Sequence, residues 1–371
     1  MKILVLNYEF PPLGGGAANA TFYLLKELAK FKKLDITLVT SSVDKYKEED
    51  FADNVKIYYL DIGKKGNIHY QSNFDLLKYS FKALKFSKKL NKEKRFDLVH
   101  AFFGIPCGYL AMRLKIPYIV GLRGSDVPFY NQRFYWLDKL FFKRLSIKIW
   151  KKSKEVVANS QGLKKLAKKS APDQRMEVIY NGVDINEFKS VKRDEKKFVI
   201  ISTSRLIQRK GVDFLLEAFV RFNKKHSNSL MYFVGSGDLE AKLIQKVIRL
   251  KLSDNVIFTG AISHSALNSY YQKADVFALP SLNEGMSNSL LEAMSSGLAI
   301  VATDTGGTKE LVDRGNGIIV QKNNSASIFQ ALETLYLNKD VLGKYKQQSR
   351  VKAEKMSWQV AAEKYLEIYK K

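Results

Sequence analysis

The sequence has few of the residues from which proteins build disulfides, metal sites and nucleophile triads. Its 371 residues include one cysteine, Cys107, and four scattered histidines. A single cysteine excludes an internal disulfide and a cysteine-based zinc site. The motifs D-x-D, H-E-x-x-H and G-x-S-x-G do not occur, which removes support for paired-aspartate metal sites, zinc chemistry and serine hydrolysis. We therefore expect no metal ion and no resident cofactor.

Long apolar runs are also missing. The N-terminal run 3–6 is too short for the core of a signal peptide. The longest mostly apolar stretch, 98–112, contains His100 and Pro106 and falls short of the roughly 20 residues that a membrane-spanning helix needs. We expect a cytoplasmic protein that meets a membrane only peripherally, at the inner face.

Acidic residues are too few to balance the basic ones. Asp and Glu number 37 against 62 Lys and Arg, a formal net charge of +25. Such an excess indicates a polyanionic partner: nucleic acid, an anionic membrane or phosphorylated substrates. Segment 129–169 holds twelve basic and two acidic residues among many aromatics, and 74–95 is a second basic, amphipathic stretch. Both are typical of membrane-surface contact. A solvated basic face is the simpler alternative, and a nucleic-acid-binding protein is the alternative of another class.

Strand and helix patterns alternate along the chain. Strands are predicted at 2–7, 36–40, 55–60, 96–100, 116–122, 155–158, 178–179, 198–203, 230–235, 256–259, 276–279, 299–302 and 317–320, and helices at 18–29, 212–222, 239–250, 287–294 and 341–371. Within the last stretch, Ser357 is a candidate N-cap for the helical pattern that follows it. A charged stretch, 189–197, interrupts the pattern and predicts a linker. The alternation favours two parallel, doubly wound α/β sheets with ligands at the carboxyl ends of their strands. Facing each other, the two sheets would form a cleft.

The segment EGMSNSLLE, residues 284–292, follows a strand and opens a helix. Gly285 lets a ligand approach the backbone, and the unpaired N–H groups at the helix start favour a phosphate. Glu284 in the loop is suited to sugar hydroxyls, and Glu292 in the first turns to ribose hydroxyls. A helix-capping loop with two surface acids is the alternative.

A basic segment, SRLIQRKG at 204–211, follows the first strand of the second half. Arg205 and Lys210 could neutralise a diphosphate leaving group there, and Arg209 is a competing candidate. An ordinary basic loop is the alternative.

Two glycine loops follow strands. Gly14, Gly15 and Gly16 could form an anion-binding nest, although neither G-x-G-x-x-G nor the P-loop pattern is present. The absence of the dinucleotide fingerprint also argues against a dehydrogenase. Gly235 belongs to a G-x-G at 235–237, which by itself is better explained by a tight turn than by a ligand site.

Polar residues end two strands of the first half. His100 ends one, and Arg123, Ser125 and Asp126 follow the next. We expect them to face the cleft, where Asp126 could accept a proton or bind an acceptor hydroxyl and Arg123 could bind an acceptor phosphate. A lone histidine is more often structural, so this alternative stays open for His100.

Together these motifs resemble the retaining family 4 glycosyltransferases of the GT-B fold. The matching segments are YEFPPLGGGAAN at 8–19, NGVD at 181–184, SRLIQRKG at 204–211, VGSGDLE at 234–240, VIFTGAIS at 256–263, the segment 279–312 with its E-x7-E pair, and MSWQVAAEKYLEIY at 356–369. The resemblance implies an α/β fold with an acceptor-binding Rossmann-like domain at 1–188, a nucleotide-sugar-binding one at 189–351, and a closing helix, 352–371, that returns to the first. It also implies metal-independent sugar transfer with retained anomeric configuration and no enzymic nucleophile.

The resemblance also implies roles for single residues. Arg205 and Lys210 would hold the donor diphosphate, Glu292 the ribose, Glu284 the donor sugar, and the backbone at 260–262 the base. The expected donor-binding residues are Gly15, Gly16, Arg205, Lys210, Gly235, Gly260, Ala261, Ile262, Glu284, Gly285, Met286, Ser287, Asn288, Leu291 and Glu292. The expected acceptor-binding residues are Gly14, Arg123, Ser125 and Asp126, and the expected catalytic ones are Glu284, Arg205, Lys210, His100 and Asp126.

Two positions depart from the family pattern. Many relatives carry H-x-H where this chain has His100 and Phe102, and many carry H-G-S-D where it has Arg123 to Asp126. These departures indicate a different acceptor, with a phosphate near Arg123. The expected function is transfer of a hexose from a nucleotide sugar, with UDP favoured over GDP, to a glycan or polyprenyl-linked acceptor at the cytoplasmic membrane face, in cell-surface polysaccharide or glycan assembly. A sugar-nucleotide epimerase or a sugar phosphorylase of the same fold is the alternative.

Overall fold

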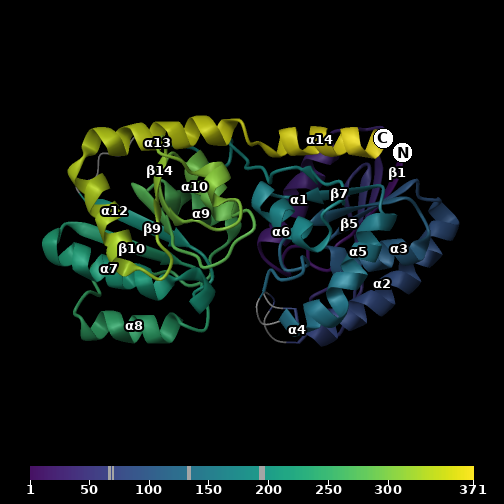
Figure 1. The fold of residues 1–371 in the computed structure, drawn as a ribbon, viewed down its shortest axis with the longest axis horizontal. Coiled ribbons are helices and arrows are strands. Elements are labelled where there is room, and N and C mark those ends of the chain that lie inside the picture. The colour runs from purple at the N-terminus through teal and green to yellow at the C-terminus, as the bar shows by residue number, and fades with distance from the viewer. Residues whose placement is uncertain (66–67, 69–70, 132–134, 192–196) are drawn as a thin grey trace. The chain divides into compact units, whose positions relative to one another are not determined.

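The computed structural model describes residues 1–65, 68, 71–131, 135–191 and 197–371. They divide into two compact units, one of Met1–Asn181 with Trp358–Lys371 and one of Gly182–Ser357 (Figure 1). Each is an α/β unit built on a parallel-dominated sheet, as the alternation of strands and helices predicts. None of the described helices is long and apolar enough to cross a membrane.

The unit boundaries differ by several residues from the expected ones at 188 and 352. Val183 pairs with Ser357 in an isolated β-bridge, and the Arg350 guanidinium donates to the carbonyls of Ile185 and Phe188. These contacts tie both crossing segments to the second unit. Most of the expected linker, at 192–196, lies outside the described residues.

The first unit contains an eight-stranded sheet in the order β3-β4-β2-β1-β5-β6-β7-β8. Its strands are β1 (Lys2–Leu6), β2 (Asp35–Ser41), β3 (Lys47–Ala52), β4 (Val55–Leu60), β5 (Leu98–Phe102), β6 (Tyr118–Leu122), β7 (Glu155–Ala158) and β8 (Glu177–Val178). Among the described strands of this sheet, only β3 runs antiparallel to its neighbour. We did not predict β3 because its sequence, KEEDFA, is mostly charged and lies at the sheet edge.

The helices of the first unit cover this sheet. They are α1 (Gly16–Leu28), α2 (Asn73–Lys94), α3 (Tyr109–Leu114), α4 (Tyr135–Leu137), α5 (Lys143–Lys152), α6 (Gln161–Ser170) and α14 (Trp358–Lys370), with π-helical turns at Gly104–Gly108 and Asp138–Phe142. Helix α14 lies beside α1, as both views show, and Trp358 stacks on Tyr23 with ring centroids 6.0 Å apart. The C-terminal helix thus returns to the first unit, as expected. The helical stretch expected at 341–371 is two helices, broken at 355–357.

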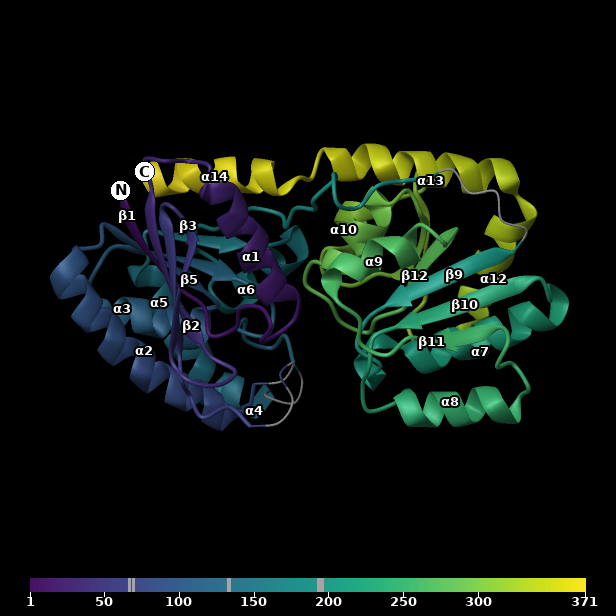
Figure 2. The same cartoon turned by 180° about the vertical axis from the view of Figure 1, so that it is seen from behind.

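The second unit contains a six-stranded parallel sheet in the order β11-β10-β9-β12-β13-β14 (Figure 2). Its strands are β9 (Phe198–Thr203), β10 (Ser229–Val234), β11 (Val256–Phe258), β12 (Val276–Leu279), β13 (Ala299–Thr303) and β14 (Gly317–Val320). Its helices are α7 (Val212–Lys225), α8 (Glu240–Arg249), α9 (His264–Tyr271), α10 (Asn288–Ser295), α11 (Thr308–Leu311), α12 (Ser325–Leu337) and α13 (Lys339–Glu354), with a 3-10 turn at Gln208–Lys210. Strands β9, β12 and β13 are buried along their whole length, so the loops after them have a rigid base.

Candidate functional site

The loops at the carboxyl ends of the second sheet contact one another through their backbones. After β9 and β10, Leu206 N–H donates to the Ser236 carbonyl, 2.9 Å away. After β10 and β11, Gly235 N–H donates to the Gly260 carbonyl at 2.9 Å. Leu282 N–H donates to the Arg209 carbonyl at 2.8 Å, which joins the loops after β12 and β9. The segments predicted to hold a nucleotide sugar therefore form one continuous surface in this unit.

Glycines make this close approach possible. Gly211 has φ +65°, and a Cβ there would lie 2.2 Å from the Pro280 carbonyl oxygen. Gly306 has φ +45°, and a Cβ there would lie 1.9 Å from the Glu284 carbonyl oxygen. Side chains at either position would push the loops apart. By contrast, Gly260 has φ +66° and faces open space, so its backbone is open to a ligand.

Lys210 and Glu284, predicted separately from two motifs, form an ion pair. The Ser281 hydroxyl donates to the same carboxylate at 2.8 Å, and the Arg209 guanidinium donates to the Asn283 carbonyl at 3.1 Å. Burial opposes ionisation of Glu284, but the charges of Lys210 and Arg209 outweigh it and lower the pKa of this carboxyl. Glu284 is therefore held as a carboxylate in a mostly enclosed, positively charged setting.

Glu292 is held by two side chains that sequence reasoning missed. Its Oε1 lies 3.1 Å from Nε2 of His264, and the Tyr271 hydroxyl donates to its Oε2 at 3.0 Å. Nδ1 of His264 lies 3.3 Å from Oε1 of Glu187, so the imidazole bridges two carboxylates. No local pattern links these residues, because the partners come from the start of α9, its end, and the segment before β9.

The two carboxylates change the protonation of His264. Burial opposes its charged form, but the hydrogen bonds to Glu292 and Glu187 and their charges raise the pKa of the imidazole above its ordinary value. A protonated His264 would donate from both ring nitrogens. The orientation of Glu292 is then set from both sides, by His264 and Tyr271.

The start of α10 has the expected form, with one correction. The Ser287 hydroxyl caps the helix by accepting from Leu290 N–H at 3.3 Å. Ala261 is exposed and Asn288 partly exposed, which leaves them open to a ligand. Leu291, expected to bind the donor, is fully buried in the unit, so its side chain is wrongly placed for such a contact. Met286 is buried as well.

The glycine loop of the first unit precedes α1. Gly14 has φ +94°, and a Cβ there would lie 2.5 Å from Oε2 of Glu9. Gly15 and Gly16 are exposed at the helix start, and the first turn of α1, all of which is described, contains no acidic residue. This terminus carries the partial positive charge that attracts an anion.

His100 does not face an open edge of the sheet, so the expectation that it points toward a ligand is wrong. It is fully buried, because α14 covers it: its Nδ1 lies 2.7 Å from the Tyr369 hydroxyl, and its ring lies 4.9 Å from that of Tyr365. Burial and the charge of Arg123 lower the pKa of His100 well below its ordinary value. The structural alternative holds for this histidine.

Asp126 also has a structural environment. Its Oδ1 accepts from the N–H groups of Arg123 and Gly124, both at 2.9 Å, and its Oδ2 accepts from Gly104 N–H at 2.7 Å. Burial raises the pKa of Asp126, although these backbone donors favour the charged form. The carboxylate therefore orders the loop that presents its neighbours. Ser125 is exposed on that loop.

Arg123 is half-buried in the same loop, and its Nε is enclosed. Its guanidinium carbon lies 4.5 Å above the ring of Phe102, and its Nη1 donates to Oδ1 of Asn181 at 2.8 Å. Phe102 stands where many relatives have the second histidine of H-x-H, and Arg123 stands where they have the histidine of H-G-S-D. The phenylalanine ring thus supports the arginine side chain. The two departures from the family pattern are one coupled feature.

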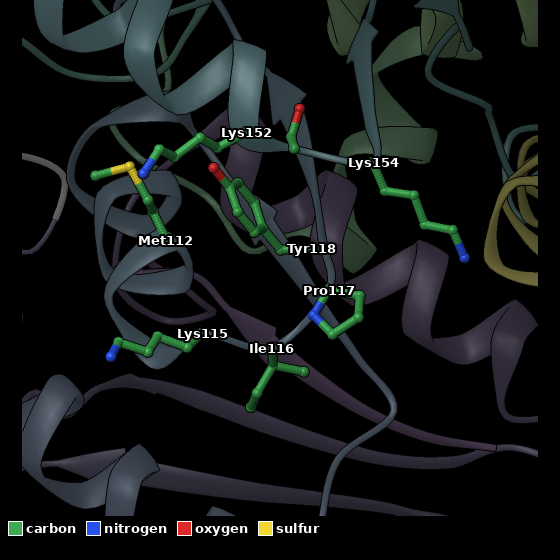
Figure 3. Close-up of a pocket in the computed structure, with 8 residues that line it drawn as sticks. Met112, Lys115, Ile116, Pro117, Tyr118, Lys152 and Lys154 are labelled. Carbon is green, nitrogen blue, oxygen red and sulfur yellow. The ribbon is translucent and has the colours of Figure 1, made fainter.

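Two further observations concern cavities and metals. A pocket of about 550 Å³ lies where β6 begins and α5 ends (Figure 3). Lys115, Lys152, Lys154 and Tyr118 line it together with apolar side chains. It lies at the amino ends of the strands, and no predicted site residue contributes to it. Among the described residues, no cluster of three or more His, Cys, Asp or Glu is placed to hold a metal ion.

Comparisons with known families match both units. The family described as Glycosyltransferase Family 4 matches residues 14–187, and Glycosyl transferases group 1 matches residues 183–355. An uncharacterized glycosyltransferase of Methanocaldococcus jannaschii is 25% identical over 97% of this chain and 95% of that protein. The N-acetylgalactosamine-N,N'-diacetylbacillosaminyl-diphospho-undecaprenol 4-alpha-N-acetylgalactosaminyltransferase of Campylobacter jejuni is 27% identical over 75% of this chain and 77% of its own length.

Solved structures agree on the fold. Sucrose-phosphate synthase from Thermosynechococcus elongatus has a TM-score of 0.87 at 17% identity, over 100% of this chain and 98% of its own. Anabaena HepE, solved in complex with UDP-glucose, has a TM-score of 0.74 at 19% identity, over 99% of this chain and 98% of its own. At these identities the likeness concerns the fold, which is that of the GT-B glycosyltransferases.

Proposed function

The chain belongs to glycosyltransferase family 4, and from this premise we propose that it transfers a hexose from a UDP-sugar, with retention and without a metal ion, to a glycan or polyprenyl-linked acceptor. The observation that carries the proposal is the Lys210–Glu284 pair. It joins the basic loop after β9 to the loop before α10, and so supports a common site for the residues predicted to bind the diphosphate and the donor sugar.

The diphosphate would bind between Arg205, Lys210 and the first N–H groups of α10. Its arrival supplies Lys210 with a second anionic partner beside Glu284. Glu284 stays ionised because its pKa is lowered, and it can then accept hydrogen bonds from hydroxyls of the donor sugar. Glu292, oriented by His264 and Tyr271, would accept from the ribose hydroxyls. The open backbone at Gly260 would face the base.

The reaction breaks the bond between the anomeric carbon and the diphosphate oxygen and forms one from that carbon to the acceptor oxygen on the same face. The acceptor proton passes to the departing phosphate oxygen, so no enzymic base is required. Fixed cations at the diphosphate stabilise the charge that develops on it, and positioning of the acceptor supplies the rest of the rate. His100 takes no part in this scheme, since it is buried under α14.

The acceptor would bind to the first unit, at Arg123 and Ser125 and beside the loop 14–16. The Campylobacter relative acts, by its name, on a diphospho-undecaprenol-linked sugar. A diphosphate-linked acceptor of this kind suits the Arg123 guanidinium. We place the reaction at the cytoplasmic face of the membrane, in polysaccharide or glycan assembly.

The test is acceptor-dependent release of nucleotide. The purified chain is incubated with UDP- and GDP-sugars, each with and without polyprenyl-diphosphate glycans, and released UDP or GDP is measured. Release of UDP only with acceptor is the expected result. Equal release without acceptor, or sugar phosphate formed only with inorganic phosphate, would point to an epimerase-type or phosphorylase reaction and overturn the transferase.

Two controls sharpen the test. Lys210→Met should abolish release, whereas Lys225→Met, which removes an exposed lysine paired with Glu333, should leave it unchanged. Thermal stabilisation by oligonucleotide and not by UDP would favour the nucleic-acid-binding alternative.

A further inference from the structure

Helix α2 has two apolar faces, and only one of them packs on the sheet. The inner face includes Tyr79, Ala83 and Leu90, all buried. The outer face carries Phe74, Leu77 and Phe81, whose exposed fractions are 65%, 67% and 74%. Their spacing of three and four residues places them in one stripe along the helix. An exposed apolar stripe of this kind marks an interaction surface.

The segment of α4 and the π-helical turn after it exposes a second apolar set. Trp136, Leu140 and Phe141 have exposed fractions of 68%, 69% and 59%. Asp138 within the same segment points inward, where its Oδ2 accepts from Phe129 N–H at 2.8 Å. This hydrogen bond anchors the segment, so the outward direction of its apolar side chains is built into the fold. The start of α2 and α4 lie at the same end of the first unit in both views (Figures 1 and 2).

Cations surround both apolar sets, and the acidic residues there are buried. Helix α2 and segment 135–152, all described, contain thirteen Lys and Arg and three acidic residues. Asp75, which pairs with Lys64, and Asp138 are buried, whereas Glu93 is exposed at the opposite end of α2 from Phe74. The exposed charge beside the two apolar sets is therefore positive. A surface that combines apolar side chains with unopposed cations matches a layer of anionic headgroups above acyl chains.

We propose that this surface, the outer face of α2 with α4 and the turn 138–142, docks the first unit on an anionic phospholipid bilayer. Trp136 and the phenylalanines insert at the headgroup level, and Leu77 and Leu140 reach the acyl boundary. The exposed Leu77 and Leu140 argue against a nucleic-acid partner, because leucine side chains cannot stack on bases as aromatic ones do. The inference deepens the proposed function, since a polyprenyl-linked acceptor lies in such a bilayer, but it does not depend on the identity of the donor.

Trp136 provides a direct probe of docking. The chain has three tryptophans, and the other two, Trp150 and Trp358, are buried. Vesicles of phosphatidylcholine with phosphatidylglycerol should shift the tryptophan emission to shorter wavelength and sediment with the protein. Vesicles of phosphatidylcholine alone should bind at least about tenfold more weakly, because the cations add attraction only to anionic lipid. Trp136→Phe should remove the shift and leave sedimentation.

Matched variants test the residues. Leu77→Ser with Phe81→Ser changes exposed side chains only and should weaken binding to anionic vesicles at least about tenfold. Ile248→Ser with Leu337→Ser, exposed apolar positions of the second unit, should bind like the wild type. Equal or negligible binding to both kinds of vesicle, or equal losses in both pairs of variants, would overturn the docking surface.

The outcome is separable from the proposed function. Acceptor-dependent UDP release from a short, water-soluble acceptor should be the same in Leu77→Ser with Phe81→Ser as in the wild type. If vesicle binding fails and this release persists, the docking surface is wrong and the transferase stands. If vesicles bind and no UDP or GDP is released with any donor, the docking surface stands and the proposed transferase activity is wrong.

Discussion

The Lys210–Glu284 pair makes a quantitative prediction about the second unit. The two side chains are 13% and 11% exposed, so the pair is enclosed enough that its loss leaves an uncompensated charge. Lys210→Met removes the cation and leaves the Glu284 carboxylate with the Ser281 hydroxyl and the Arg209 charge. The substitution is therefore both a test of diphosphate binding and a structural perturbation.

Its magnitude follows from the setting. Removing one partner of a buried ion pair lowers the free energy of unfolding by about 3–5 kcal/mol. We expect a loss of about 3 kcal/mol for Lys210→Met, because Arg209 and Ser281 still contact Glu284 or its loop. The double variant Lys210→Met with Glu284→Gln removes both charges and should lie within about 1 kcal/mol of the wild type. Since the pKa of Glu284 is lowered in the fold, the stability that the pair contributes is present above the ordinary carboxyl pKa and is lost as the pH falls through the lowered one.

Hydrogen exchange followed by mass spectrometry measures this locally. Peptides from 280–296 should exchange about 100-fold faster in Lys210→Met and near the wild-type rate in the double variant. All three tryptophans, Trp136, Trp150 and Trp358, belong to the first unit, so tryptophan fluorescence reports on that unit as an internal control. Unchanged exchange at 280–296 in the single variant would refute the reasoning.

The remaining predictions concern other contacts. Glu187 and Glu292 raise the pKa of His264. The stability that its protonation contributes is therefore fully present below about pH 6.5 and is lost as the pH rises through the raised pKa. His264→Gln should flatten this pH dependence in thermal midpoints measured from pH 6 to 9. Gly211→Ala, which forces a Cβ to 2.2 Å from a carbonyl oxygen at φ +65°, should cost at least about 2 kcal/mol, and a wild-type exchange rate in 204–216 would contradict it. Asp126→Ala leaves three backbone N–H groups without an acceptor and should lower the free energy of unfolding of the first unit by about 3 kcal/mol. Tryptophan fluorescence would measure this loss, and UDP affinity should stay unchanged.

The fold could be predicted from the sequence where apolar periodicity was strong. The buried runs of β1, β9 and β12 and the alternation with helices were sufficient for two parallel sheets. Strand β3 was not predicted, because an edge strand needs no apolar face and its sequence is mostly charged. Helix α14 begins directly after Ser357, the residue predicted as its N-cap. The interruption at 355–357 was not predicted, because the bridge of Ser357 to Val183 that accompanies it joins residues distant in the sequence.

The site was partly predictable for the same physical reason. The carboxyl ends of adjacent parallel strands lie at one edge, so motifs after β9 and β12 had to meet. Which side chains pair within that edge depends on tertiary contacts: Lys210 with Glu284, and His264 with Glu292, have no local pattern. The same holds for His100, because α14 buries it. Its contact there, Tyr369, lies 269 residues later in the sequence.

Calorimetric titration of UDP and UMP into the wild type and into Lys210→Met with Glu284→Gln tests the diphosphate site most directly. This double variant lacks the cation and is expected to keep nearly the wild-type stability. The wild type should bind UDP more tightly than UMP, and the double variant should lose about 10- to 100-fold in UDP affinity while its UMP affinity stays the same. Equal UDP affinity in the two proteins would contradict a donor diphosphate held by Lys210.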